Sequence, residues 1–449
     1  VSREALAIKR DQVLGVEDTE GLDYPDGGFK AYLVLFGCFC GLTVCLGFIN
    51  SIGAVSGYLS IHQLSNLPAS TISWIFSIYL CLAYGTGIFI GSLFDKKGAF
   101  KILACSTALI FLGLMATANC VEVWQFILSF ISLGVGNGIG LPPLVAVINQ
   151  WFFKKRGQAI GIATCGGSAG AILFTLTLRH LYFEFGFVWA MRTVAFMCLT
   201  LMSIATGLAK ERITRDPKSK PKRHQQQIDD EIAFEKSFWN RVLQALDPHR
   251  LNNLDLKFCF LVTGAFMGEL SLILTLTYFP SYAIARGFSE SDSYLLLTVW
   301  NATGILGRWL PGYVSDKLGR FNVNIIMILG LNICLFVIWL PFGGKGLNVL
   351  YAFAALGGFY SASVLSMVPT CLAQITLASE LGKKYSIVNA FMSVGNLVVI
   401  PIGASIISKG SIHDYNMFVV LVACLALGAF IFWTLSRFMI VGTKFNIKV

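Results

Sequence analysis

Three ionisable side chains lie inside long apolar stretches of this sequence: Arg192, Glu269 and Arg308. An ionisable group at the centre of a lipid bilayer costs at least about 2.5–3.5 kcal/mol, so each of the three is a candidate for function. Arg192 is near the end of its apolar stretch, where its aliphatic stem can extend toward water, and this position favours a structural role. Arg308 and Glu269 lie deeper, so they are the main candidates for binding and coupling.

Arg308 is about six residues from the nearer end of its stretch, or roughly 9 Å at about 1.5 Å per residue. A guanidinium presents a planar set of donors, which favours an organic anion or a carbonyl-bearing solute as its partner. Glu269 is about twelve residues into its own stretch, roughly 18 Å deep. A carboxyl group at that depth suits the loading and release of a proton. The equally weighted alternative is a static pairing of Glu269 with Arg308 or with a neighbouring hydroxyl.

Neutral side chains in the same apolar stretches are candidates for binding a solute. Asn50 and Asn301 can orient polar groups. Phe359 and Ser363 are four residues apart, so they share one face of a continuous helix, and Tyr360 can stack on a flat ring. Polar and aromatic residues of this kind also make ordinary contacts between membrane helices, and that alternative stays open.

Patterns typical of enzymes and metal sites are missing from the sequence. The pattern Gly166-Gly-Ser168-Ala-Gly170 lies in an apolar stretch and lacks the strand–turn–helix setting of a nucleophile elbow. The five histidines are scattered, and Cys38-x-Cys40 has no histidine or acid beside it. Most of the twelve cysteines lie in apolar stretches, where cysteine behaves as a small apolar residue. We therefore expect no catalytic residues, no metal and no cofactor.

The elements that must position these residues are membrane-spanning helices. The chain has 449 residues, of which 55% are hydrophobic and only 13% charged, whereas soluble domains are about 25% charged. Apolar runs of about 20 residues can cross a bilayer as helices. Twelve such runs lie near Ala31–Gly53, Ser73–Leu93, Phe100–Ala118, Trp124–Ile148, Gly157–Leu178, Phe187–Ala209, Phe258–Phe279, Tyr294–Val314, Asn324–Leu340, Leu350–Leu372, Ile387–Ile407 and Met417–Leu435. The sequence predicts an all-α membrane protein with twelve transmembrane helices in two six-helix bundles.

The basic residues of the chain lie almost entirely on one side of these predicted spans. Of the 34 Lys and Arg residues, 28 are in the two tails and in one set of alternate loops. The opposite loops hold only Arg179, Arg286, Lys345 and Lys409. Basic loops stay in the cytoplasm, so both termini are predicted to be cytoplasmic. The net charge of +10 is thus explained by topology, and we expect a lipid bilayer rather than a nucleic acid as the partner.

The predicted spans divide the chain into five parts. Residues 1–29 form a cytoplasmic tail, residues 30–209 the first six-helix bundle and residues 257–436 the second. Residues 210–256 are a long hydrophilic segment and are predicted to be a cytoplasmic linker. Residues 437–449 form the cytoplasmic C-terminal tail.

A short charged motif follows the second apolar stretch and recurs after the eighth. The copies are Gly91-Ser-Leu-Phe-Asp95-Lys96-Lys97-Gly98 and Gly312-Tyr-Val-Ser-Asp316-Lys317-Leu318-Gly319-Arg320. Its glycine allows helices to approach closely, and its aspartate can face the positive N-terminal end of a neighbouring helix. The motif resembles the signature loop of the major facilitator superfamily, whose halves are parallel repeats joined by a cytoplasmic loop. The resemblance implies a conformational latch at Gly91, Asp95, Lys96, Gly312, Asp316 and Lys317.

Further motifs resemble the monocarboxylate porter family within that superfamily. They are Pro25-Asp26-Gly27-Gly28-Phe29, the run from Trp151 to Gly161, and Gly304-x-x-Gly307-Arg308-x-x-x-Gly312-x-x-x-Asp316. The segment Gly307-Arg308-Trp309-Leu310-Pro311-Gly312 looks most like the fungal branch of the family, which includes a riboflavin importer. The resemblance implies that Arg308 binds substrate and that Phe359 and Ser363 are similar to a pair that lines the pocket.

Two departures from the family pattern affect the expected substrate. Animal proton–lactate porters carry a lysine late in the first helix and an aspartate one turn before the helix-eight arginine, and here these positions are Asn50 and Gly304. We therefore expect a secondary transporter of a small organic anion or heterocycle that works by alternating access and is not a lactate–proton symporter. Uptake of riboflavin or another flat heterocycle, with or without protons, is one alternative. A non-transporting nutrient sensor is the other. The plasma membrane is the expected location, with the vacuolar membrane as the alternative.

Overall fold

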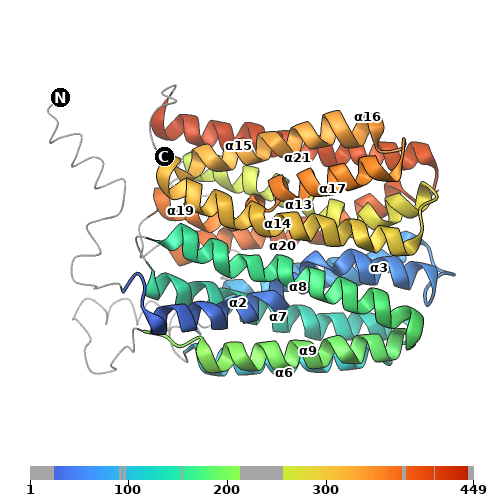
Figure 1. Cartoon of the computed structure of the whole chain (residues 1–449), viewed down its shortest axis with the longest axis horizontal. Helices are drawn as coiled ribbons and strands as arrows, with labels where there is room; N and C mark the ends of the chain where they lie inside the picture. The colour runs from blue at the N-terminus through green and yellow to red at the C-terminus, as the bar shows by residue number, and fades with distance from the viewer. Residues whose placement is uncertain are drawn as a thin grey trace, which may run out of the picture.

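The structure is a computed structural model, and it describes residues 25–90, 94, 98–152, 155–212, 256–376, 381–408 and 410–442. The described part of the chain is helical, with the long helices lying side by side along one common direction (Figure 1). The helices of the first half are α2 (Phe29–Asn50), α3 (Ile52–Ile61), α4 (Ala69–Gly85), α6 (Ala99–Thr117), α7 (Val123–Trp151), α8 (Arg156–Glu184) and α9 (Gly186–Leu208). Those of the second half are α13 (Leu256–Ala285), α14 (Glu290–Leu318), α15 (Arg320–Ile333), the π-helical η2 (Cys334–Trp339), α16 (Leu340–Phe342), α17 (Leu347–Ser361), α18 (Ser363–Ser366), α19 (Val368–Ile375), α20 (Leu381–Ile406) and α21 (Ile412–Val441).

Ten helices of the described chain are long and apolar enough to cross a membrane. Two further helical segments lie beside them. The helix α14 has 29 residues but carries charged side chains near both ends, and α17 has only 15 residues before the chain breaks into α18 and α19. The helical membrane architecture expected from the sequence is confirmed. Twelve crossings and the cytoplasmic side of the termini stay predictions.

The tenth apolar stretch is not one continuous helix. The helix α17 ends at Ser361, and α18 begins at Ser363 after Ala362. A second break at Met367 precedes α19, which has Pro369 in its first turn. Ala362, the residue between the two helices, keeps right-handed helical backbone angles. A common face for Phe359 and Ser363 stays a prediction.

The last helix continues past residue 436, since α21 ends at Val441. The buried Arg437 donates a hydrogen bond from its Nε to the Asn322 side chain. The boundary of the second bundle stays a prediction. The predicted linker cannot be compared in the same way, since residues 213–255 lie outside the described part of the chain.

The two halves meet chiefly where α8 packs on α14, α4 on α20 and α3 on α13, and α18 adds a smaller contact with α8. Figure 1 shows α8 running beside α14 in the middle of the molecule. Glycines make these seams tight. A Cβ atom on Gly312 would lie 3.1 Å from the carbonyl oxygen of Gly157, and one on Gly53 would overlap the carbonyl oxygen of Leu276. Backbone therefore approaches backbone where the halves touch.

The molecule has two ends, which we name by the chain. The terminus end is where α2 begins and α21 ends, at the left of Figure 1. The far end holds the connection between α3 and α4 and the beginning of α14. At the far end the halves are joined by His62 Nε2 and Glu290 Oε2, 3.6 Å apart, and by Arg179, whose Nη2 donates to Ser291 Oγ over 2.6 Å.

Candidate functional site

Arg308 lies at the seam between α8 and α14, with only 4% of its surface exposed. Its Nη1 donates a hydrogen bond to the backbone carbonyl of Thr164 on α8 over 2.7 Å. Gly167 leaves the room for this contact, because a Cβ there would lie 2.7 Å from the same nitrogen. Within the described structure, Arg308 Nε has no hydrogen-bond partner. The guanidinium thus joins the two halves and keeps one donor free.

Glu269 is fully buried on α13. Its Oε1 accepts a hydrogen bond from the hydroxyl of Tyr84 on α4 over 2.6 Å. Its Oε2 has no hydrogen-bond partner among the described residues. Of the alternatives that the sequence leaves open for this carboxyl group, the neighbouring hydroxyl is the contact that forms, and it too runs from one half to the other.

The two buried charges are neighbours without a direct contact. Arg308 and Glu269 are close enough for their charges to interact, yet no ion pair within 4.0 Å joins them in the described part of the chain. Each is held instead by a group of the first half, Thr164 or Tyr84. Static neutralisation by a salt bridge is therefore not what holds these side chains in place in this conformation.

The neutral candidates are divided between the site and the helix packing. Asn50 is buried at the end of α2, and its Nδ2 finds no partner in the described chain. Asn301 Nδ2 donates to the Leu297 carbonyl one turn back on α14 over 2.9 Å. Ser363 Oγ donates to the Tyr360 carbonyl over 3.3 Å, so both Asn301 and Ser363 satisfy groups of their own helices.

The aromatic pair on α17 packs inside the second half. Phe359 and Tyr360 have ring centroids 5.2 Å apart. The Tyr360 ring lies directly on Gly330 of α15, and the backbone of Phe359 lies against Gly307 of α14. The Tyr360 ring thus contacts α15 inside the second half, and stacking of a solute on this ring stays a prediction.

Gly304 faces the other half. A Cβ there would lie 3.1 Å from Ser168 Oγ on α8 and 3.6 Å from the Gly358 carbonyl. An acidic side chain one turn before Arg308 would have to fit in this space, and the chain has a glycine instead. The position one turn before Arg308 thus carries no charge.

Tyr84 and Asn396 are buried polar residues that the sequence patterns do not single out. Tyr84 is the hydrogen-bond donor to Glu269. Asn396 on α20 is fully buried, and both its Nδ2 and its Oδ1 have no partner in the described structure. The available signal is the spacing of Asn389, Ser393 and Asn396, which puts three polar side chains on one face of an otherwise apolar helix.

The second copy of the charged motif reaches the other half. The Asp316 carboxylate accepts a hydrogen bond from the backbone N–H of Gln158 in the first turn of α8. Arg320 Nη2 lies 3.8 Å from Asp316 Oδ1, and Lys317 Nζ donates to the Tyr313 hydroxyl over 2.6 Å. A negative charge at a helix N-terminus is stabilising. The placement of Asp316 agrees with the expectation from the sequence, while Gly91, Asp95 and Lys96 lie outside the described residues.

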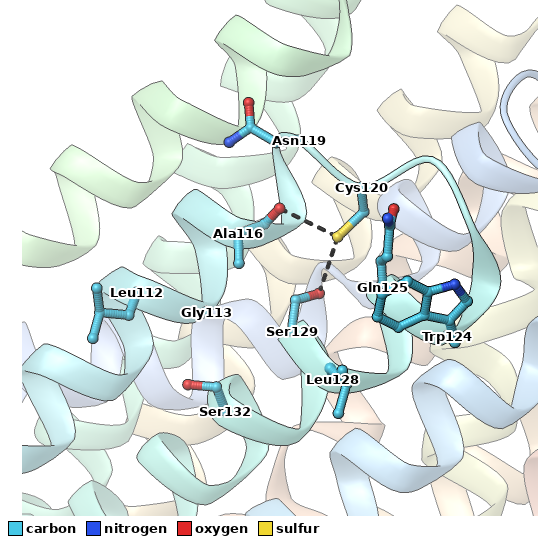
Figure 2. A pocket seen from close by; sticks show the side chains of 10 residues that line it. All are labelled: Leu112, Gly113, Ala116, Asn119, Cys120, Trp124, Gln125, Leu128, Ser129 and Ser132. Atoms are coloured by element: carbon cyan, nitrogen blue, oxygen red, sulfur yellow. Dashed lines mark hydrogen bonds between the residues drawn. The ribbon is translucent and has the colours of Figure 1, made fainter.

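Arg192 and a surface cavity near it are away from this seam. Arg192 Nη2 donates to Asn119 Oδ1 over 3.0 Å, and its guanidinium lies over the Trp189 ring. A cavity of about 430 Å³ lies nearby between α6 and α7, lined by Leu112, Trp124 and other side chains (Figure 2). Leu112 and Trp124 are both 60% exposed on the outer surface of the apolar bundle. This hollow is a groove on the membrane-facing surface rather than a site between the halves.

Comparison with known proteins agrees with this geometry. The sequence pattern described as Major Facilitator Superfamily matches residues 37–348. A relative from Saccharomyces cerevisiae, the riboflavin transporter MCH5, is 41% identical over 429 residues, covering 94% of this chain and 80% of the relative. An MFS-type transporter from Gibberella moniliformis is 32% identical over 428 residues, covering 95% of each chain. The aspyridones efflux protein apdF from Emericella nidulans is 30% identical over 393 residues, covering 87% of this chain and 74% of the relative. The chain therefore belongs to the Major Facilitator Superfamily, and it is a multi-pass membrane transporter rather than an enzyme.

Proposed function

We propose that this protein moves a flat, polar heterocycle of the riboflavin type across the membrane by alternating access. The observation that carries this proposal is the pair of buried, oppositely charged side chains at the seam, Arg308 and Glu269, each with one polar atom unpartnered among the described residues. The similarity to a riboflavin transporter over 94% of this chain supports the same substrate class. Membership in the monocarboxylate porter family, twelve crossings, cytoplasmic termini and a plasma-membrane location belong to this proposal.

The charges at the seam favour a solute without a strong net charge. One cation and one carboxyl group offer both donors and acceptors. A heterocycle with ring carbonyls and N–H groups can bind to both, whereas a small carboxylate would be attracted by Arg308 and repelled by an ionised Glu269. Asn50 and Gly304 occupy the positions of the lysine and the aspartate that the lactate–proton resemblance requires. Lactate is therefore proposed to be a poor substrate.

Alternating access requires contacts between the halves to break and re-form. The hydrogen bonds Tyr84–Glu269, Arg308–Thr164 and Gln158–Asp316 all cross the seam. Bound solute competes for Arg308 and Glu269, so binding weakens two of these bonds and favours the rearrangement. A ligand can shift a conformational equilibrium only by such a difference in its contacts with the two states. Glu269 is the proposed proton carrier, since it is the buried carboxyl group at this seam.

The test is uptake of labelled riboflavin by riboflavin-auxotrophic yeast cells that lack their own riboflavin transporter. Expression of this protein is expected to raise uptake well above that of empty cells. Arg308→Ala is expected to return uptake to the background at an unchanged membrane level of protein. Arg192→Gln, which removes an arginine outside the seam, is the matched control and should keep uptake. Unchanged riboflavin uptake on expression of the protein, or robust proton-coupled lactate uptake by the purified protein in liposomes, would refute the proposal.

A further inference from the structure

The helix α20 carries a buried polar stripe whose function is not explained by Arg308 or by the charged motif. Asn389, Ser393 and Asn396 are all buried, and their spacing of four and three residues puts them on one face of the helix. The opposite face carries Val394, which is 64% exposed on the membrane-facing surface, and Val398. The polar stripe therefore points into the bundle.

Contacts of the stripe locate it at the junction of α4, α13 and α20. Ser393 Oγ donates to the carbonyl of Cys81 on α4 over 2.7 Å. A Cβ on Gly85, also on α4, would lie 2.7 Å from Ser393 Oγ. Tyr84, whose hydroxyl binds Glu269, is the residue before Gly85. At Ser393, α20 therefore contacts α4 at the residue that follows Tyr84.

The adjacent residue of α20 connects the stripe to α13. A Cβ on Gly395 would lie 3.0 Å from the side chain of Leu270, the residue that follows Glu269. Asn396 comes next on α20. Glu269 directly precedes Leu270, so Asn396 and Glu269 each lie one residue from this contact between α20 and α13.

The Asn396 amide is not satisfied by the protein. Both its donor and its acceptor have no partner in the described part of the chain, and the side chain is fully buried. Glu269 Oε2 likewise has no hydrogen-bond partner among the described residues. Buried polar groups in folded proteins are nearly always hydrogen-bonded, so an unpartnered amide and an unpartnered carboxyl oxygen on two helices in contact point to a ligand that satisfies both.

We propose that Asn396 is a specificity-determining residue that recognises a cyclic amide edge of the transported solute. The side-chain Nδ2 donates to a ring carbonyl while Oδ1 accepts from the adjacent ring N–H, and Glu269 Oε2 accepts from a further donor of the solute. An asparagine amide matches a neighbouring acceptor and donor with two parallel hydrogen bonds. This inference rests on the proposed function in assuming a heterocyclic substrate, and it adds the chemical group by which that substrate is selected.

The test compares wild type with Asn396→Leu, which keeps the size of the side chain and removes the amide. Riboflavin uptake is measured with riboflavin and its N3-methyl derivative as competitors, because methylation removes the ring N–H. The wild type is expected to favour riboflavin over the methylated compound by about tenfold or more, the discrimination typical of one lost hydrogen bond in a buried site. Asn396→Leu is expected to raise KM for riboflavin by about tenfold and to bind both compounds equally.

The matched control on the same stripe is Asn389→Leu. The Asn389 side chain already has a partner in Tyr385, so its loss is expected to lower thermal stability without changing the preference between the two competitors. Asn396→Ser is the second variant should the leucine reduce expression. A preference for riboflavin that survives both Asn396 variants would overturn the inference.

Binding to the purified full-length protein separates this inference from the proposed function. Thermal stabilisation is measured with riboflavin, uracil and their N-methylated forms, for wild type and Asn396→Leu. If riboflavin is not transported but another cyclic amide stabilises the protein in a manner that depends on Asn396, the riboflavin proposal fails and this inference stands. If none of these cyclic amides stabilises the wild type, the inference is wrong.

Discussion

The hydrogen bond between Tyr84 and Glu269 is expected to help hold the two halves together. Tyr84→Phe removes only the hydroxyl that donates to Glu269 Oε1 over 2.6 Å. Hydrogen bonds to charged groups contribute about 1.5–3 kcal/mol in soluble proteins, whereas interhelical bonds in membranes average about 0.6 kcal/mol and reach about 1.7 kcal/mol. About 1 kcal/mol is the expectation for this fully buried bond, since its geometry is good and its setting is a membrane protein.

Loss of this hydrogen bond destabilises only the conformation in which the bond forms. The bond joins α4 to α13 in the state whose far end is closed by His62–Glu290 and Arg179–Ser291. A loss of about 1 kcal/mol shifts an equilibrium constant about fivefold. Tyr84→Phe is therefore expected to increase the population with an open far end about fivefold.

The assay is the rate at which a polar maleimide labels a cysteine introduced at Ser56, which is buried on α3 near the far end, in a cysteine-depleted background. The rate should rise about fivefold in Tyr84→Phe. Tyr278→Phe is the matched control, because its hydroxyl donates to the Ile400 carbonyl over 2.9 Å within the second half. An unchanged rate in Tyr84→Phe, or an equal rise in Tyr278→Phe, would show that the Tyr84 bond does not hold the halves together.

Three further predictions concern the buried charges, the motif and the topology. Arg308→Ala is expected to abolish transport and Glu269→Gln to leave exchange intact while net uptake loses its pH dependence, measured as flux at two pH values. Poor expression of both single variants with recovery in the double variant would show instead that the two residues only neutralise each other. Asp316→Asn removes a charge from the N-terminus of α8, an interaction of about 0.3–1 kcal/mol. Because this contact holds the terminus end closed, the variant should lower the labelling rate at the far end about two- to fivefold; no change would mean that Asp316 does not hold the terminus end closed. Accessibility tags at Gln226 and Asn66 should report the cytoplasm and the outside respectively, and an external Gln226 would reverse the predicted topology.

The parts of the site that could be predicted are those that stand out against an apolar background. A charged residue deep in a hydrophobic stretch is visible in the sequence alone, and for this reason Arg308 and Glu269 were identified. The contact of Asp316 with the start of α8 followed from helix electrostatics. Both inferences depend on the chemistry of one residue and on its depth along a helix.

The hydrogen-bond partners of these residues depend on how the helices are rotated relative to one another. This rotation cannot be predicted from the sequence patterns. Tyr84 and Asn396 lie in long apolar helices, where similar residues commonly make helix contacts. The break at Ala362 has no proline at the point of interruption, since Pro369 follows seven residues later. The contact of the Tyr360 ring with Gly330 is a further packing detail that the sequence does not show.

The partner of Arg308 in the first half is a main-chain carbonyl, and this has a consequence for how the protein tolerates variation. Every residue at position 164 supplies the same carbonyl oxygen, so exchange of the Thr164 side chain leaves the acceptor of the 2.7 Å bond in place. Gly167 has no such freedom, because any side chain there would occupy the space of the guanidinium. In related sequences that keep this arginine, we therefore expect the residue at position 164 to vary and the glycine at position 167 to be retained.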